Sequence, residues 1–390
     1  MQSNIKHIKL SEVADVIDSL HQTPKYCNKG IPMVRVTDVR AGDLDLTNCL
    51  MVSAEDYEKY SVKHKPQIGD IIISRVGSYG IFSYVASSKA FCLGQNTAII
   101  SPKINSRYLY YVLSSFFVRQ QIEQMVVGST QKTISLKNIK DLQIPLFDEK
   151  EQDKIAQILE SIDKKIAVNK QINDNLYEMV NTYYTSLFKD VECEMTTIGN
   201  YAERIYSGGT PTTSNAAYWD GAFGWFSSGE TRNRFVISTE KTITQAGIDN
   251  SSTKLAAKHD IVMASAGQGF TRGQTSMLLI DTYVNQSVIV IHTERKVLPY
   301  LFWNLANRYE ELRAISDSSS IRGSLTTKMI AAFEIPLANE ESLQAFADFS
   351  WSVIPQIENN LLENERLAAL RDTLLPKLMS GEIDVSNIQL

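Results

Sequence analysis

The sequence offers few residue combinations that could catalyse a reaction. The five His, at positions 7, 21, 64, 259 and 292, show neither HxxxH nor HExxH spacing, and the chain has no GxSxG segment and no phosphate-binding P-loop. It also lacks the Asn/Asp-Pro-Pro-aromatic tetrapeptide that an amino-methyltransferase would use on a flipped base. Four Cys without CxxC spacing argue against zinc and against a disulfide framework. We therefore expect no catalytic, cofactor or metal site in this chain.

Two weaker patterns are interpreted as turns. Residues 266–273, AlaGlyGlnGlyPheThrArgGly, contain GxG, but Arg272 stands where a dinucleotide-binding GxGxxG segment has its third Gly. Asp70 and Asp260 occupy matching positions ahead of two apolar runs. Neither has an obvious ExK partner, so we interpret both as turn residues rather than metal ligands.

Side chains suited to contacts with bases and phosphates are more numerous. Arg can bond guanine through two hydrogen bonds, Asn or Gln can do so with adenine, and Lys and Ser hold phosphates. The candidates for DNA binding are Arg35, Arg40, Ser74, Arg75, Ser78, Tyr79, Asn96, Gln131 and Lys132 in the first half, and Trp225, Ser228, Arg232, Arg234, Ser265, Gln268, Arg272, Gln286 and Arg322 in the second. The alternative for a single Arg or Gln is a solvated surface residue. For Trp225 and Tyr79 it is burial in the core.

The first 148 residues alternate short β-type segments with turns. Residues 31–39, 69–76 and 96–102 are rich in β-branched residues and bounded by Gly or Pro, which predicts strands. Residues 107–125 predict one helix with an aromatic face. A polar stretch, a short helix and a strand ending at Pro145 follow. These elements predict an α/β body that would position the candidate contact residues.

The same order of segments returns about 190 residues later. GlyAspIleIleIleSer (69–74) matches HisAspIleValMetAlaSer (259–265), GlnAsnThrAlaIle (95–99) matches AsnGlnSerValIle (285–289), and IleProLeu occurs at both 144–146 and 335–337. Between these anchors the two copies differ. We infer a tandem duplication whose common frame carries two different sets of loop residues, and loops are where recognition usually resides.

A long helical segment follows each body. Residues 149–188 contain neither Pro nor Gly, and their apolar residues recur at gaps of four and three, which predicts a helix of about 60 Å with a heptad seam. A shift of 191 residues maps five seam positions onto identical residues of the second segment. The predicted coiled-coil seam comprises Ile162, Ile166, Asn169, Asn173, Leu176, Leu187, Ile357, Asn360, Asn364, Leu367 and Leu378. Its Asn residues would fix register and partner. Pro355 predicts a kink or a restart near Ile354.

Length and composition indicate a multidomain globular protein. We divide the 390 residues into a first body at 1–148, a first helix at 149–190, a second body at 191–338 and a second helix with a C-terminal tail at 339–390. No signal-peptide pattern and no apolar run near 18 residues occurs, so we expect a cytoplasmic protein without a membrane span. The net charge is −5, but residues 1–148 hold 17 Lys and Arg against 13 Asp and Glu. The global charge therefore does not exclude a local basic surface.

Together these segments resemble the specificity subunits of type I restriction-modification systems. The resemblance rests on SerGlyGlyThrPro (207–211), TyrTrp (218–219), GlyTrpPheSer (224–227), HisAspIleVal (259–262) and LeuLeuProLysLeuMetSerGlyGlu (374–382). The first half carries a degraded version, with GlnThrPro (22–24) and GlyGlnAsn (94–96). The resemblance covers essentially the whole chain, and the order and duplication of the motifs make it specific.

The resemblance implies two α/β target recognition domains, each gripping one half of a bipartite, asymmetric site in double-stranded DNA. It implies that two conserved helices pack as an antiparallel coiled coil and fix the gap between the half-sites. Two methylation subunits would bind S-adenosylmethionine and methylate adenine, and restriction subunits would cut DNA with ATP and Mg. This chain would be non-catalytic and would hold none of those cofactors.

Three departures from the family pattern stand out. His259 replaces Gly, SerLeuHisGln (19–22) replaces a Gly-rich turn, and Pro355 interrupts the second helix. Two other hypotheses remain: a scaffold whose two bodies bind proteins and whose coiled coil dimerises, and a solitary nuclease or methyltransferase. The second would require a catalytic cluster.

Overall fold

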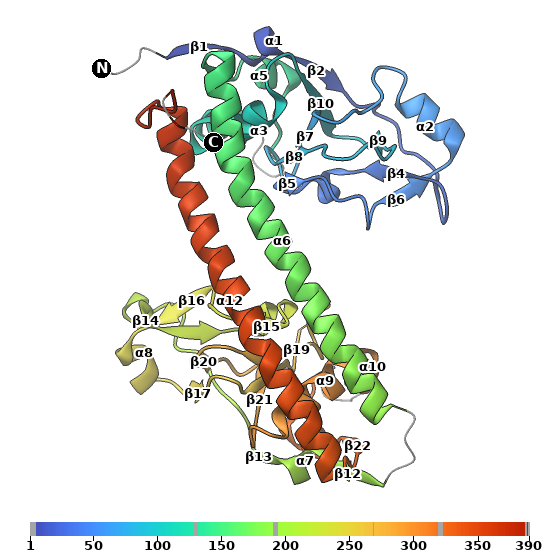
Figure 1. Ribbon diagram of the computed structural model, residues 1–390, viewed down its shortest axis with the longest axis vertical. Helices are drawn as coiled ribbons and strands as arrows, with labels where there is room; N and C mark the ends of the chain where they lie inside the picture. The colour runs from blue at the N-terminus through green and yellow to red at the C-terminus, as the bar shows by residue number, and fades with distance from the viewer. Residues whose placement is uncertain are drawn as a thin grey trace. The chain divides into compact units, whose positions relative to one another are not determined.

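The chain forms two compact units. The computed structural model describes residues 5–127, 132–189, 194–267, 269–318, 323–386 and 388. Unit 1 comprises Met1–Ile166 and Arg366–Leu390, and unit 2 comprises Ala167–Glu365. Each unit contains a sheet-bearing body and one half of each of two long helices, α6 (Glu149–Phe188) and α12 (Glu340–Met379) (Figure 1).

Unit 1 contains a five-stranded sheet of order β2-β10-β7-β8-β5, a four-stranded sheet of order β3-β6-β4-β9 and the pair β1-β11. The strands are β1 (Lys6–Lys9), β2 (Ala14–Asp18), β3 (Tyr26–Cys27), β4 (Ile31–Val34), β5 (Gly42–Asp43), β6 (Leu50–Val52), β7 (Ile71–Ser74), β8 (Phe82–Tyr84), β9 (Cys92–Leu93), β10 (Thr97–Pro102) and β11 (Gln143–Leu146). The helices are α1 (Leu10–Val13), η1 (Val36–Asp38), α2 (Ala54–Tyr60), α3 (Ser106–Ser114), α4 (Phe116–Met125) and α5 (Leu136–Lys140).

Unit 2 contains a five-stranded sheet of order β13-β21-β18-β19-β15, a four-stranded sheet of order β16-β14-β20-β17 and the pair β12-β22. The strands are β12 (Met195–Thr197), β13 (Ala202–Ser207), β14 (Trp219–Phe226), β15 (Phe235–Val236), β16 (Lys241–Ile243), β17 (Lys254–Ala256), β18 (Ile261–Ala264), β19 (Thr275–Leu278), β20 (Thr282–Val284), β21 (Val288–Thr293) and β22 (Glu334–Pro336). The helices are α7 (Ile198–Tyr201), η2 (Ala216–Tyr218), η3 (Ser228–Arg232), α8 (Gln245–Asp249), α9 (Leu298–Asn307), α10 (Tyr309–Ser318) and α11 (Thr327–Ala331).

The two five-stranded sheets share one topology. In each, the central strand, β7 or β18, pairs antiparallel with both neighbours, and the last strand, β5 or β15, pairs parallel. The four-stranded sheets differ, because the fourth strand is β3 beside β6 in unit 1 but β17 beside β20 in unit 2. The duplication inferred from the sequence is thus visible in the frame, and the copies diverge in the smaller sheet.

Two details of the helix prediction are wrong. The single helix expected over 107–125 is two helices, because Ser115 is extended (φ −72°, ψ 155°) and its Oγ accepts a hydrogen bond from the Val118 amide, which starts α4. Of the kink or restart expected near Ile354, the restart does not occur, since α12 continues through Pro355.

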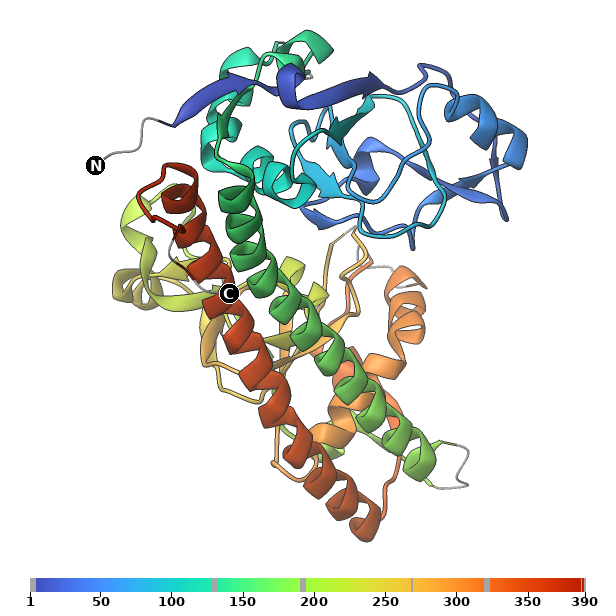
Figure 2. The same cartoon turned by 45° about the horizontal axis from the view of Figure 1, so that its top comes forward.

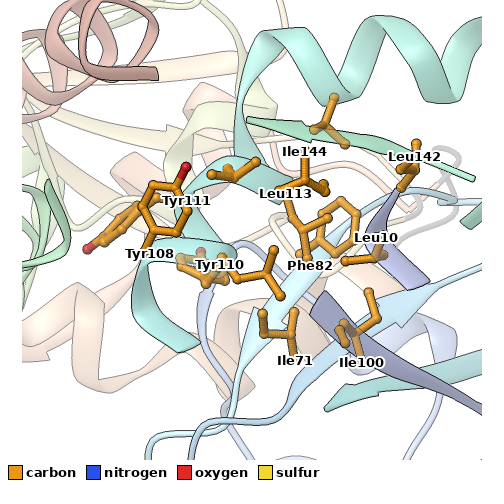
Figure 3. Packing of buried hydrophobic residues seen from close by; sticks show 14 of the residues in the cluster. Leu10, Ile71, Phe82, Ile100, Tyr108, Tyr110, Tyr111, Leu113, Leu142 and Ile144 are labelled. Atoms are coloured by element: carbon orange, nitrogen blue, oxygen red, sulfur yellow. The ribbon is translucent and has the colours of Figure 1, made fainter. Parts of the chain in front are cut away.

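Both long helices contribute to both hydrophobic cores. The core of unit 1 includes Ile155 and Leu159 of α6 and Leu378 of α12. Figure 3 shows other residues of the same core, among them Leu10, Ile71, Phe82 and Leu113, packed against one another. The core of unit 2 includes Tyr177 and Val180 of α6 together with residues of α9 and α12. A helix whose two halves lie in different cores gains its stability from tertiary packing over its whole length.

The helix pair is antiparallel within each unit. In unit 2 the Asn169 Nδ2 donates to Asn364 Oδ1 at 3.0 Å, and the Asn360 Nδ2 donates to Asn173 Oδ1 at 2.8 Å. In unit 1 the Arg371 Nη1 donates to an oxygen of Asp163 at 2.9 Å, which again joins α6 to α12. These contacts, with the two sheet-bearing bodies, confirm the predicted fold class.

The backbone at position 259 explains why Gly is favoured there. Its φ is +77°, and the matching residue of unit 1, Gly69, has φ +95°. Glycine adopts this conformation readily, whereas other residues are strained in it. Packing of the His259 ring on Trp351, with ring centroids 4.8 Å apart, accompanies the strained backbone.

Asp70 and Asp260, which follow these residues, both cap a turn. Asp70 accepts a hydrogen bond from the Gln67 amide at 2.8 Å, and Asp260 accepts one from the Ala257 amide at 2.9 Å. Each carboxylate also bonds a histidine, Asp70 with His64 and Asp260 with His292. Their place in turns agrees with the sequence interpretation.

Candidate nucleic-acid interface

Each unit displays a loop from the end of its central strand. In unit 1 this loop, residues 75–80, joins β7 to β8, and in unit 2 residues 265–273 join β18 to β19. The first residue of each loop is held in the same way. The amide of Arg75 bonds the Asn96 carbonyl and its carbonyl accepts from Ile134, while Ser265 bonds Ser287 and Leu325 correspondingly. The sequence-predicted Ser74, Arg75, Ser78, Tyr79 and Asn96 are thereby brought to one end of the sheet in unit 1.

Exposed polar groups of unit 1 gather around Tyr79. Its hydroxyl donates to Glu123 at 2.7 Å, and the cations of Lys132 and Arg119 lie over its ring. The hydrogen bond from Tyr79 lowers the pKa of Glu123. The pKa of Lys132 is raised, chiefly by its hydrogen bond and charge interaction with Tyr79 and next by the charge of Glu123. Lys132 therefore stays protonated, and its 53% exposed side chain can meet an anion.

Two other predicted residues of unit 1, Ser74 and Arg75, make hydrogen bonds within the unit. The Ser74 hydroxyl is buried and donates to the Ser78 carbonyl. The Arg75 Nη1 bonds Asp18 Oδ1 at 2.5 Å and its Nε bonds the Ile134 carbonyl at 3.3 Å, with only 12% of the side chain exposed. These two residues position the loop.

Arg35 and Arg40 lie off loop 75–80. Both oxygens of Asp38 accept from the Arg35 guanidinium at 2.9 Å, which raises the pKa of Arg35. Arg40 is exposed, and its backbone is tied to the Ser83 hydroxyl. Ser78 is exposed on the loop, and Asn96 adopts φ +63° in the turn before β10.

In unit 2 the loop is anchored by Arg272. Its guanidinium bonds Asp317 of α10 and the Gly323 carbonyl, the latter at 2.7 Å, and its side chain is 9% exposed. Ser265 is buried at the start of the loop. Gln268, Arg322 and, in unit 1, Gln131 lie outside the described residues.

The remaining candidates of unit 2 form three separate groups. Trp225 is buried and donates to the Gly209 carbonyl at 3.3 Å, while exposed Gln286 accepts from Thr210, so both stand beside the SerGlyGlyThrPro segment. Ser228 and Arg232 lie on η3. Arg234 faces α6, with its guanidinium 4.1 Å from the Tyr177 ring centre. The structure therefore does not bring the second set of candidates together in one place.

Sequence reasoning missed Asp18 and Asp317, the carboxylates that hold Arg75 and Arg272, and it missed Phe270. Phe270 is 86% exposed on loop 265–273. The unequal length of the two loops between matching anchors is a signal that could have drawn attention to it.

None of the helices in the described parts of the chain is long and apolar enough to cross a membrane. Within those same parts, no three His, Cys, Asp or Glu side chains are grouped as metal ligands would be.

Comparisons with known proteins identify the family. The model of the type I restriction modification DNA specificity domain matches twice, at residues 2–178 and 191–366. The chain is 26% identical over 282 residues to the Escherichia coli type I restriction enzyme EcoR124I/EcoR124II specificity subunit, and the match covers 68% of this chain and 67% of that protein. It is 21% identical to the Haemophilus influenzae HindI specificity subunit, with 81% of this chain and 86% of the relative covered.

A solved structure has the same fold. The crystal structure of the type I restriction-modification S subunit from M. genitalium superposes with a TM-score of 0.60 at 17% sequence identity, covering 97% of both chains. With two matches that together span most of its length, this chain belongs to the family of type I restriction-modification DNA specificity domains.

Proposed function

We propose that this chain is the sequence-specific DNA-recognition subunit of a type I restriction-modification complex, reading one half of a bipartite site with each unit. The observation that carries the proposal is that a chain of this family contains two five-stranded sheets of the same topology whose connecting loops differ. Equal frames suit the repeating DNA backbone, and unlike loops suit two different half-site sequences.

The chemistry of the side chains suggests which of them would bind phosphates and which would contact bases. Exposed cations such as Lys132 would bind phosphates and dock the units, while polar loop residues would read base edges in the major groove. Distortion of the bound duplex would help a partner subunit flip an adenine.

We further propose that two methylation subunits and the restriction subunits supply the chemistry, and that the complex works in the cytoplasm, where its DNA is. S-adenosylmethionine, ATP and Mg would belong to those partners. This chain would hold none of them.

The salt dependence of binding tests the proposed phosphate contact. Lys132→Ala should lower the affinity of the chain, copurified with its methylation subunits, for a duplex. It should also make the slope of log K against log salt shallower by about 0.9, because one phosphate contact is lost. Fluorescence anisotropy of a labelled duplex at several salt concentrations measures both.

Lys103 provides the matched control. Its side chain is also 53% exposed, pairs with Asp15, and follows β10 at the end opposite Asn96. Lys103→Ala should leave the slope unchanged. Equal slopes for wild type and Lys132→Ala would remove Lys132 from the interface.

A further inference from the structure

The two matched loops differ in length. The hydrogen bond that closes each loop joins the Gly80 amide to the Ser74 carbonyl at 2.7 Å in unit 1, and the Gly273 amide to the Ala264 carbonyl at 2.9 Å in unit 2. The closing pairs are thus six and nine positions apart. Since the strands on both sides correspond, the extra residues of unit 2 lie wholly within the loop.

The longer loop presents Phe270 to solvent on an anchored backbone. The Tyr309 hydroxyl donates to the Phe270 carbonyl at 2.6 Å, and the Arg313 Nη1 donates to the Gly269 carbonyl at 2.6 Å. Both donors belong to α10, beside which the loop projects in Figure 2. The ring is 86% exposed although its backbone is fixed. An exposed Phe loses the stabilisation that burial would give, which suits a side chain that is buried only in a complex.

The surroundings of Phe270 suit a polyanion that approaches closely. Arg272 and Arg313 both pair with Asp317, so this cluster of three side chains carries one net positive charge. A Cβ at Gly267 or Gly269 would meet no atom within 4 Å, so the loop backbone is open on its outer side. A bulky apolar side chain flanked by cations is the arrangement with which proteins unstack DNA base pairs.

Unit 1 has no equivalent wedge among the described residues of its loop. Its aromatic residue there, Tyr79, is half-buried and bonded to Glu123 at 2.7 Å. We propose that Phe270 inserts between two base pairs of the half-site bound by unit 2, and that unit 1 binds its half-site without such an insertion. This inference rests on the proposed function.

Fluorescence of 2-aminopurine tests this wedge. The probe is the methylation complex with duplexes of its own target, defined by methylation mapping, in which 2-aminopurine replaces one base at a time outside the methylated adenine. Wild type should raise the fluorescence at one step of the unit 2 half-site, because unstacking relieves quenching. Phe270→Ala should abolish that rise and weaken binding about tenfold, the effect of losing one base–aromatic stack.

Two variants serve as controls. Phe270→Trp should keep the rise, and Phe116→Ala, which removes a 70% exposed Phe from α4, should change neither signal nor affinity. A rise that persists in Phe270→Ala would overturn the wedge. So would a wild-type complex that binds its target without any rise, even if Phe270→Ala binds more weakly, since the ring would then only touch a base edge. A wild type that methylates no specific site would instead contradict the proposed function.

Discussion

Replacing Trp303 with alanine is expected to lower the free energy of unfolding of unit 2 by about 3–5 kcal/mol. Trp303 is fully buried on α9, where its ring stacks on Tyr177 of α6 at 5.7 Å and meets Phe346 of α12 edge-on at 5.8 Å. The indole thus joins both long helices to the body of unit 2. Its removal leaves a cavity between three elements that cannot all collapse into it.

Hydrogen exchange of the full chain measures this effect and locates it. Peptides of β18, β21 and α9 should lose protection in Trp303→Ala. Trp303→Phe should lose much less, because a ring remains and the indole Nε1, which has no hydrogen-bond partner, is removed. Unchanged protection of unit 2 in Trp303→Ala would show that the helices do not depend on this contact.

The second large effect is expected at Arg75. Arg75→Ala should destabilise unit 1 by about 2–3 kcal/mol, because it leaves the Asp18 carboxylate without its strongest partner. The value lies below that of a fully buried pair because 12% and 21% of the two side chains are exposed. Chemical denaturation measures the free energy of unfolding, and hydrogen exchange of peptides from β2 and β7 locates the loss of stability.

Asp18→Asn distinguishes a positioning role from direct DNA contact. This variant breaks the same pair but keeps the cation, so a positioning role predicts that both variants lose stability and DNA affinity alike. A loss of affinity confined to Arg75→Ala would assign Arg75 to the DNA surface. A stable Arg75→Ala protein would refute the structural role.

The sequence predicted the frame well because the frame depends on local patterns. Heptad spacing predicted both long helices, and matched anchors predicted two similar sheets. It failed at Ser115, where one side chain caps a new helix inside an apolar run. It also failed in allowing a restart near Pro355, where α12 is continuous and its neighbours Val353, Ile354 and Ile357 pack in the core of unit 2. Such outcomes depend on tertiary context that propensity does not contain.

Individual contacts were harder to predict than the frame. Arg75 and Arg272 have the residue type and loop position of DNA-binding residues, yet each bonds a carboxylate that is distant in sequence, Asp18 and Asp317 respectively. No local pattern reveals such a partner. Phe270 was missed for the opposite reason, since an aromatic residue in a Gly-rich turn carries no periodic signal.

The central claim is that the two units direct methylation to a two-part DNA sequence. Its most direct test is to coexpress this chain with its methylation subunits, methylate a random-sequence DNA pool, and map modified positions by sequencing. We predict a split motif with one methylated adenine on each strand, in which exchanging the body of unit 2 changes one half only. A complex that assembles and binds S-adenosylmethionine but methylates no defined sequence would contradict the claim and favour a protein-binding scaffold.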